Sequence, residues 1–213
     1  WLRSESQTDT PSAQRRRRGF ASLASAGDAA VFDQLAAAVR AHPDWTPLWL
    51  AARLSEVNIM GILAEVGAET HVVKKGGTNL VMAPIALIRE RGSRAGKRSP
   101  EEEKRDTPEA KLDAVRTALG FSIDVNMADD DGNTALHMAA THELNSVVQL
   151  LVDRGAAINA KNNEDKTPLM LALASRQRDS DDEAASDKLS TADLLRQLGA
   201  MEPPAEEPVE PGM

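Results

Sequence analysis

The sequence predicts an all-α solenoid, in which a helix–turn–helix unit is repeated and stacked. Two observations indicate this fold class: a short threonine-led segment recurs along the chain, and each copy is followed by an apolar helix that ends in glycine. The composition of the chain is a further observation that favours this fold class. Apolar residues make up 41 % of the 213 residues, yet aromatic residues are only 3 % and tyrosine is absent. The core must therefore consist mainly of Ala, Leu and Val, which suit closely packed helices better than a β-sandwich.

The clearest repeat is a short segment that returns along the chain. Residues 134–140 (TALHMAA) return as residues 167–173 (TPLMLAL), and residues 46–52 (TPLWLAA) are a third copy. The interval from Thr134 to Thr167 defines the repeat length. Residues 78–83 (TNLVMA) are a weaker fourth copy, which begins just short of one repeat length after Thr46. In each copy the threonine hydroxyl can cap the free N–H groups of a helix, and proline is tolerated in the first turn.

A glycine that closes the second helix of each copy checks this register. In two copies the interval from the threonine to the glycine is the same, and in the other two it is longer, so these contain polar insertions. The four glycines are Gly67, Gly120, Gly155 and Gly199. Glycine is favoured there because the helix ends in a left-handed residue. Between the anchors, the helix predicted at 146–153 carries Val147, Leu150 and Leu151 on one face.

Residues 131–140 (DGNTALHMAA) and 148–160 (VQLLVDRGAAINA) together resemble the ankyrin repeat. That family folds each unit of about 33 residues as a turn and two antiparallel helices. The resemblance covers residues 19–200 and implies a non-enzymatic scaffold that binds another protein through its concave face. The long insertions and the Ala/Arg-rich composition look similar to bacterial ankyrin proteins.

This register predicts the domain organisation. We expect a flexible basic linker at 1–18, an ankyrin repeat domain at 19–200 and a disordered Pro/Glu-rich tail at 201–213. The domain divides into an amino-terminal helical cap at 19–41 and repeats at about 42–73, 74–128 with an insertion at 92–108, 129–161, and 162–200 with an insertion at 177–187. Because one repeat cannot bury its apolar face alone, we expect the repeats to stack.

Departures from the family pattern predict that the repeats differ in regularity. Asp44 and Asp165 occupy the position of the turn glycine, and Glu143 that of the glycine between the helices. Trp49 and Met170 replace the family's histidine. We therefore expect the repeat at 129–161 to be the most regular.

No set of residues suggests a catalytic or metal site. The absence of cysteine excludes disulfides, a thiol nucleophile and thiolate metal ligands. The resemblance makes His137 a structural residue that ties the backbones of neighbouring repeats. Residues 129–132 (DDDG) look like a calcium loop, but Ala140 occupies the position where that loop needs its closing acidic residue. We expect neither an enzyme nor a cofactor.

The net charge of −8 is unevenly distributed. Residues 1–18 hold five arginines and two acidic residues, so the rest of the chain is strongly acidic and poorly suited to nucleic acid. The Arg15–Arg18 run could contact nucleic acid or an anionic membrane, or act as a nuclear address; a solvated junction or a processing site is the alternative. No apolar run reaches about 18 residues, so we expect no membrane insertion. The expected partner is a protein, and the chain is expected to be a monomer.

The resemblance implies that the partner contacts the turn tips and the first helices. These predicted partner-binding residues are Trp45, Arg53, Leu54, Asp130, Asp131, Asn133, Thr141, His142, Asn163, Glu164 and Lys166. An ordinary solvated side chain is the alternative at each position, and Trp45 is the expected aromatic anchor. Because the chain begins at Trp1 instead of Met, a second hypothesis makes it the carboxy-terminal targeting or regulatory module of a longer enzyme or envelope protein. The sequence assigns neither the partner nor a compartment.

Overall fold

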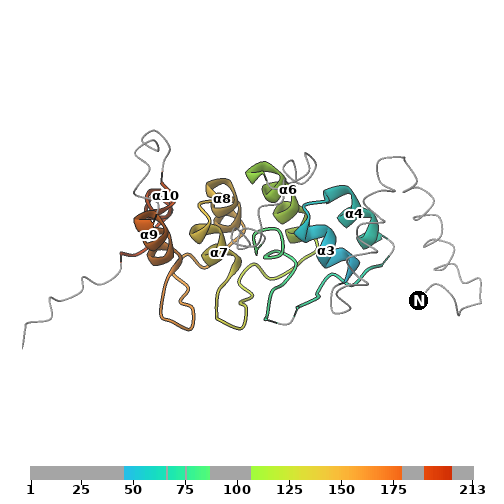
Figure 1. The fold of residues 1–213 in the computed structure, drawn as a ribbon, viewed down its shortest axis with the longest axis horizontal. Coiled ribbons are helices and arrows are strands. Elements are labelled where there is room, and N and C mark those ends of the chain that lie inside the picture. The colour runs from blue at the N-terminus through green and yellow to red at the C-terminus, as the bar shows by residue number, and fades with distance from the viewer. Residues whose placement is uncertain (1–45, 66, 75, 87–106, 179–189, 203–213) are drawn as a thin grey trace, which may run out of the picture. The chain divides into compact units, whose positions relative to one another are not determined.

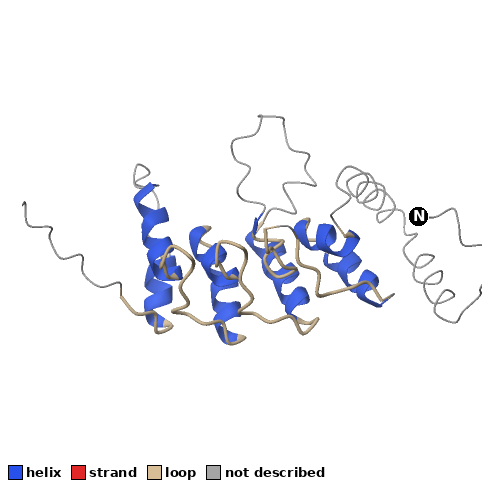
Figure 2. Ribbon diagram, turned by 90° about the horizontal axis from the view of Figure 1, so that it is seen from below, coloured by secondary structure: helices blue, strands red, loops and turns tan. Residues whose placement is uncertain are grey.

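A computed structural model describes residues 46–65, 67–74, 76–86, 107–178 and 190–202. This part of the chain contains seven α-helices and no β-strand, which confirms the all-α class (Figures 1 and 2). The helices are α3 (Pro47–Arg53), α4 (Val57–Glu65), α6 (Pro108–Leu119), α7 (Ala135–Thr141), α8 (Asn145–Asp153), α9 (Pro168–Arg178) and α10 (Thr191–Gln197). The predicted linker and amino-terminal cap lie outside the described residues.

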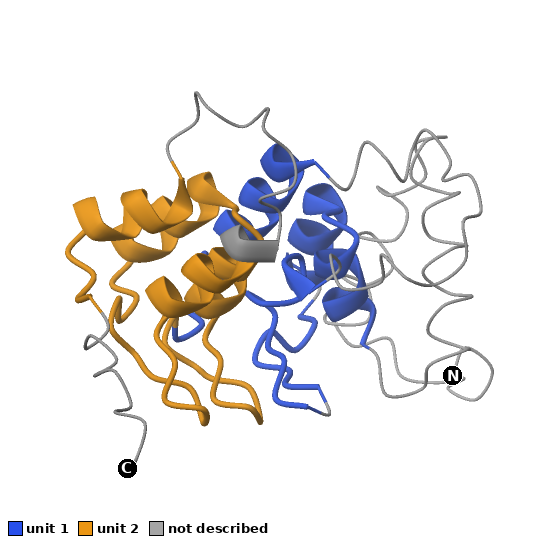
Figure 3. Cartoon of the chain, turned by 60° about the vertical axis from the view of Figure 1, so that its left-hand side comes forward, with its two compact units in different colours: residues 1–124 blue, residues 125–213 orange. Residues whose placement is uncertain are grey.

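Contacts group the chain into two compact units, residues 1–124 and residues 125–213 (Figure 3). In unit 1, α3 packs against α4, and both helices contact α6. In unit 2, α7 packs against α8 and α9, and α10 packs against α8 and α9. Two helix pairs are therefore stacked in unit 2, with the first helices in one layer and the second helices in the other (Figure 1).

The predicted threonine caps are present at two helix starts. The Thr46 hydroxyl accepts a hydrogen bond from the Trp49 N–H at 3.2 Å, and the Thr167 hydroxyl accepts one from the Met170 N–H at 3.3 Å. A proline follows each threonine at the first helical position, where its missing N–H costs nothing. The recurring segment therefore opens α3 and α9 as predicted.

In the weaker copy, the cap is Asn79 and not Thr78. The Asn79 side-chain oxygen accepts hydrogen bonds from the N–H groups of Val81 and Met82, at 2.9 and 3.0 Å. Asn79 lies one full repeat length after Thr46, so the structure corrects the shorter spacing predicted from Thr78 to the regular one. Asparagine caps a helix as well as threonine does, and a search led by threonine overlooks it.

Within the described residues, turns take the place of the first helix predicted in this copy. Residues 80–85 are a series of turns, in which the Ala83 N–H reaches the Asn79 carbonyl at 3.1 Å and the Ile85 N–H reaches the Met82 carbonyl at 2.9 Å. Pro84 gives the physical reason. It has no N–H to donate to the carbonyl of Leu80, and its ring clashes with that carbonyl in an α-helix.

The helix end predicted at Gly120 is present, because α6 ends at Leu119 with Gly120 as its C-cap, but the expected left-handed conformation lies elsewhere. Gly120 has right-handed helical angles (φ −64°), whereas Ser122 adopts the left-handed φ of 61°. Ser122 lies one repeat length before Gly155, whose φ is 88°. The left-handed position therefore follows the repeat spacing, and serine occupies it where the other copies have glycine.

The core of α8 differs at one position from the predicted face. Val147, Val148 and Leu151 are fully buried, whereas Leu150 is half-buried. The buried face of α8 therefore contains Val148 where the sequence predicted Leu150. The three equivalent positions of α10 are also buried, namely Thr191, Ala192 and Leu195. They follow the positions in α8 by one repeat length plus the inserted segment.

Two predicted boundaries move at the carboxy-terminal end. Helix α9 continues to Arg178, so the first two residues of the predicted insertion at 177–187 are helical. The first two residues of the tail predicted at 201–213 are bonded to the repeats. The Met201 N–H donates to the Asn159 side chain at 2.8 Å, and the Glu202 carboxylate pairs with Arg196.

Candidate functional site

The site is built on two hairpin loops of unit 2, residues 129–133 and residues 162–166. In the first loop, the Asp129 N–H donates to the Asn133 carbonyl at 2.9 Å; in the second, the Asn162 N–H donates to the Lys166 carbonyl at 3.0 Å. Each loop turns through a left-handed residue, at Gly132 with φ 78° and at Asp165 with φ 58°. The two loops precede α7 and α9 and project from the helices on one side of unit 2 (Figure 3).

Side chains at matching positions hold each loop in shape. The Asp129 carboxylate accepts hydrogen bonds from the N–H groups of Asp131 and Asn133, at 3.0 and 2.8 Å. Asn162 lies one repeat length later, and its side-chain oxygen accepts the two corresponding N–H groups, both at 3.0 Å. Asp129 and Asn162 therefore stabilise the loops from within, as short polar side chains do in turns.

The two loops are also bonded to each other. Asn163 donates its N–H to the Asp131 carbonyl at 3.0 Å and its side-chain amide to the Asp130 carbonyl at 2.9 Å. The Asn162 side-chain amide donates to the Asn133 side chain at 2.9 Å. These three bonds join consecutive repeats, so the loops form one structure and not two separate tips.

Gly132 makes this close approach possible. A Cβ atom at this residue would lie 2.6 Å from the side-chain oxygen of Asn163 and 2.7 Å from its backbone nitrogen. Its left-handed φ independently favours glycine. Two separate constraints therefore fix this residue.

The exposed charges of the loops are not equivalent. The Lys166 amine lies 2.6 Å from the Glu164 carboxylate, and the Lys161 amine lies 3.5 Å from Asp165. The hydrogen bond from Lys166 holds the pKa of Glu164 below its usual range. Asp130 and Asp131 are exposed, and neither carboxylate has a cationic partner among the described residues. The exposed carboxylates of the loops that lack a cationic partner in the described ranges are therefore those of Asp130 and Asp131.

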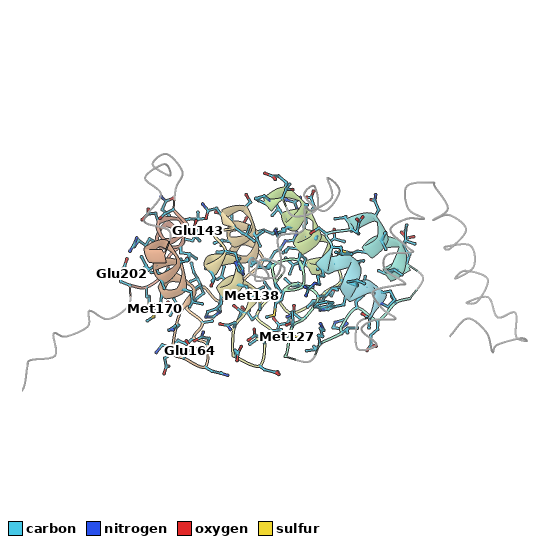
Figure 4. The ribbon with its side chains drawn as sticks, in the orientation of Figure 1. Met127, Met138, Glu143, Glu164, Met170 and Glu202 are labelled. Carbon is cyan, nitrogen blue, oxygen red and sulfur yellow. The ribbon has the colours of Figure 1, made fainter. Side chains whose placement is uncertain are left out.

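The predicted residues of α7 lie at its carboxyl end. Thr141 is the last helical residue, and its hydroxyl donates to the His137 carbonyl at 2.9 Å. His142 is the C-cap, and both side chains are half-buried. Figure 4 shows Glu164 at the tip of its hairpin loop and Glu143 away from that tip, in the turn between α7 and α8.

One predicted residue of unit 1, Arg53, lies beside a buried tryptophan. Trp49 is 2 % exposed; the Lys74 amine lies 4.4 Å from the centre of its ring, and the Arg53 guanidinium lies 5.7 Å from it. Both cations are within the range of cation–π attraction. Leu54 is the half-buried C-cap of α3. Trp45, the expected anchor, lies outside the described residues.

His137 has the structural position that the resemblance implied. Its ring is fully buried; Nε2 lies 3.1 Å from the Lys166 carbonyl, and Nδ1 accepts from the Thr134 N–H at 3.1 Å. Burial lowers the pKa of His137, and the hydrogen bonds to the backbones of Lys166 and Ala160 and the charge of Asp129 oppose this only in part. Through Lys166, the ring ties α7 to the loop of the next repeat.

Sequence reasoning missed the role of two asparagines, whose side chains also bond to the backbone of a later segment. The Asn126 side-chain oxygen accepts from the Ala157 N–H at 2.7 Å, and the Asn159 oxygen accepts from the Met201 N–H at 2.8 Å. Each asparagine binds the segment that follows the glycine at the end of the next repeat. The two asparagines are one repeat length apart, so the repeat spacing could have identified them.

Among the described residues, no group of three or more His, Asp or Glu side chains could hold a metal ion. No helix in the described ranges has the length and apolarity needed to cross a membrane.

Stacked pairs of antiparallel helices, linked by hairpin loops that bond to one another, define a helical repeat protein of the solenoid class. Residues 108–181 match the family model of ankyrin repeats in three copies. The repeats within residues 108–181 are therefore ankyrin repeats.

Several curated proteins are similar to part of the chain. A putative ankyrin repeat protein of Escherichia coli, YahD, is 33 % identical over 61 residues, which cover 29 % of this chain and 30 % of that protein. Serine/threonine-protein kinase 12 of Arabidopsis thaliana is 37 % identical over 65 residues, covering 30 % of this chain and 14 % of the kinase. The Neurogenic locus Notch protein of Drosophila melanogaster is 28 % identical over 131 residues, or 60 % of this chain and 5 % of that protein. The chain thus spans less than a third of the length of each of these relatives.

Proposed function

We propose that the chain binds a protein partner through the hairpin loops and first helices of unit 2. Ankyrin repeats are in general protein–protein interaction modules without catalytic groups of their own. The observation that carries the proposal is the set of three hydrogen bonds between loops 129–133 and 162–166. A surface ordered in this way loses little conformational entropy when a partner binds, which favours affinity.

The charge of the loops indicates a partner segment with basic residues. Asp130 and Asp131 are exposed and have no cationic partner within the described ranges, whereas Glu164 is already paired with Lys166. An exposed charge pair acts mainly on the rate of association, and its effect weakens as salt rises. The partner should therefore associate more slowly at high salt, and Asp130 and Asp131 should account for most of that dependence.

A targeting or regulatory module of a longer enzyme or envelope protein is the second candidate. It is favoured by the similarity to the plant kinase, in which the matched region is 14 % of the protein. In this case the partner surface is the same, and the catalytic or anchoring function lies in sequence outside this chain. In both cases we propose a monomer that binds protein and not nucleic acid.

The test is to identify a direct partner by affinity capture with the full chain and then to measure its binding to matched variants. The double variant Asp130→Asn/Asp131→Asn should lower the association rate several-fold at low salt in stopped flow. Glu143→Gln removes an exposed carboxylate away from the loop tips and should leave the rate unchanged. Gln149→Ala on α8 should leave the affinity unchanged in calorimetry.

Binding that Gln149→Ala or Glu143→Gln weakens, and that the double variant leaves intact, would assign the partner to another surface. The predicted anchor is tested separately, because Trp45 lies outside the described residues. Trp45→Ala should weaken binding by about 2 kcal/mol or more if this side chain is an interface anchor.

A further inference from the structure

One position of the repeat carries an ionisable side chain in a single copy. Three residues after the helix cap, the four copies have Trp49, Met82, His137 and Met170, at successive equivalent positions. His137 is the member of this set whose charge can change near neutral pH. It lies at the junction of the repeats at 129–161 and 162–200, both in unit 2.

The hydrogen bonds of His137 define the state of its ring. A carbonyl can only accept, so Nε2, at 3.1 Å from the Lys166 oxygen, carries the hydrogen. The neutral ring then has its lone pair on Nδ1, which accepts the Thr134 N–H at 3.1 Å. The Thr134 hydroxyl is 2.9 Å from the same nitrogen. This geometry needs the uncharged ring.

A second proton disrupts this arrangement at one specific atom. It would bind to Nδ1 and face the Thr134 N–H. Because this N–H belongs to the backbone, it cannot turn toward another acceptor. The Thr134 hydroxyl can rotate to accept, but the backbone N–H is then left unpaired in a buried site, which is unfavourable. The ring is fully buried, so the positive charge also loses its hydration.

The surrounding charges do not provide a counter-ion for the ring. The negative charge of Asp129 acts on the ring, but its carboxylate already accepts two backbone N–H groups of its own loop. The Lys166 amine is paired with Glu164. Of the other packed segments, α7 carries His142 at its C-cap and α8 carries Asp153 at its end, while residues 168–175 of α9 have no charge.

The last repeat is the element that a charged His137 would release. Helices α9 and α10 contact α7 and α8 within unit 2, so this repeat has one stacked neighbour there. In a stack, a repeat with a single neighbour opens at the lowest free energy. Other polar ties across this junction include the loop bonds, the contact of Thr191 with Asn145 and the hydrogen bond from the Met201 N–H to the Asn159 side chain.

We infer that His137 is a proton-sensitive latch, which holds the last repeat, α9 and α10, on α7 and α8 when neutral and releases it when protonated. The ring leaves its pocket to hydrate its charge, and both the Thr134 and the Lys166 hydrogen bonds break. Because Lys166 belongs to loop 162–166, release also loosens the loop pair that holds Asp130 and Asp131. Acid would thus weaken the surface in the absence of any partner.

The direction follows from linkage. The unfolded ring titrates near pH 6.5, and burial places the folded pKa lower. The unfolded state therefore binds more protons in the interval between the two values, and the stability of the latch is complete above about pH 6.5 and falls as pH drops through that interval. Within that interval, each fall of one pH unit should raise the equilibrium constant for opening of the last repeat by up to about tenfold.

The test is hydrogen–deuterium exchange of the full chain between pH 7.5 and 5, corrected for the intrinsic pH dependence of exchange. In the wild type, protection of residues 168–175 and 191–198 should fall with pH, up to about tenfold per unit, while that of 147–151 falls less. In His137→Gln, a neutral side chain that can both donate and accept, protection of the last repeat should not depend on pH. His142→Gln, a change of the neighbouring histidine on the same helix, should retain the wild-type dependence.

Equal pH dependence in the wild type and in His137→Gln would overturn the latch. A last repeat whose protection stays constant over the whole range would do the same. If His137→Gln does not fold, the wild type still decides, because the His137 ring can be titrated by NMR. A pKa at or above 6.5 for this ring would refute the inference, whereas a lowered value with simultaneous loss of α9 and α10 protection would support it.

Discussion

The repeat at 129–161 and the repeat at 74–128 share one register but differ in their cores. Three equivalent buried positions in or directly before the second helix, one repeat length apart, are Leu144, Val147 and Leu151 in the first and Lys111, Ala114 and Ala118 in the second. In the first helix, a pair of buried alanines at 139–140 corresponds to Pro84 and Ile85. The repeat at 129–161 has two complete helices, whereas the described residues of the other form a run of turns and one helix.

The difference shows that register and core can vary independently. Backbone features persist in the irregular repeat: Asn79 still caps, and Ser122 still adopts the left-handed angle at its position in the repeat. The apolar groups buried at the compared positions of its second helix are smaller, and hydrophobic stabilisation scales with the apolar area removed from water. The second helix of the irregular repeat therefore keeps the path of the chain with less packing energy.

The largest effect is expected from truncating the regular core. Leu151→Ala removes a fully buried side chain and should lower the free energy of unfolding by roughly 2–5 kcal/mol in chemical denaturation. Leu150→Ala on the same helix is the control and should cost clearly less, because Leu150 is half-buried. Equal costs would show that the two leucines are not packed as described. Deleting residues 93–106, outside the described ranges, should leave helicity nearly unchanged.

A glycine pair separates backbone strain from close packing in unit 2. Gly155→Ala meets no atom within 4 Å, so it should cost only the left-handed penalty of about 1–2 kcal/mol. Gly132→Ala carries the same penalty and also meets Asn163, so it should cost roughly 1–3 kcal/mol more. Thermal melts of the two variants measure the difference. Equal destabilisation would mean that the loop contact yields without cost.

A substitution in the irregular repeat should make it more regular. Pro84→Ala supplies the N–H that the Leu80 carbonyl lacks, so residues 80–86 should gain helix. An interior proline costs about 3 kcal/mol, part of which the lost burial of the ring offsets, so we expect a net gain of about 1 kcal/mol. Circular dichroism should show more helix. An unchanged spectrum would mean that another feature holds the turns.

The smallest effects are expected at left-handed residues that are not glycine. Glu143 (φ 55°) and Ser122 (φ 61°) occupy such positions in the regular and the irregular repeat. Glu143→Gly and Ser122→Gly should each stabilise the chain by about 0.5–1 kcal/mol, because glycine adopts this angle without strain. Glu143→Ala is the control and should give no gain. A gain in one repeat alone would show that the strain depends on its surroundings.

The features that recur in each repeat could be predicted from the sequence. The local departures that a single residue causes could not. The helix starts at Thr46 and Thr167 follow from capping chemistry, and the buried role of His137 follows from the family resemblance. The turns at 80–85 were missed because one proline outweighed the apolar pattern around it. Leu150 was placed in the core because a helical pattern fixes a face only to within one residue.

The candidate surface could be predicted by position and not by bonding. The loop residues of unit 2 lie together as expected, but the sequence does not reveal that Asn163 donates its amide to the Asp130 carbonyl. Nor does it show that Lys166 pairs with Glu164, while the exposed carboxylates of Asp130 and Asp131 have no cationic partner in the described ranges. Such choices depend on side-chain geometry between repeats, which residue order alone does not encode.

Amide hydrogen exchange by NMR in the full chain tests the difference between the two repeats most directly. The amides of residues 147–151 lie in the large core of α8, and those of residues 114–118 occupy the equivalent turns of α6 with smaller side chains. Amides in the better packed segment open at higher free energy. We expect residues 147–151 to exchange at least about tenfold more slowly, which corresponds to a difference of about 1.4 kcal/mol. Equal rates, or slower exchange in residues 114–118, would contradict the account.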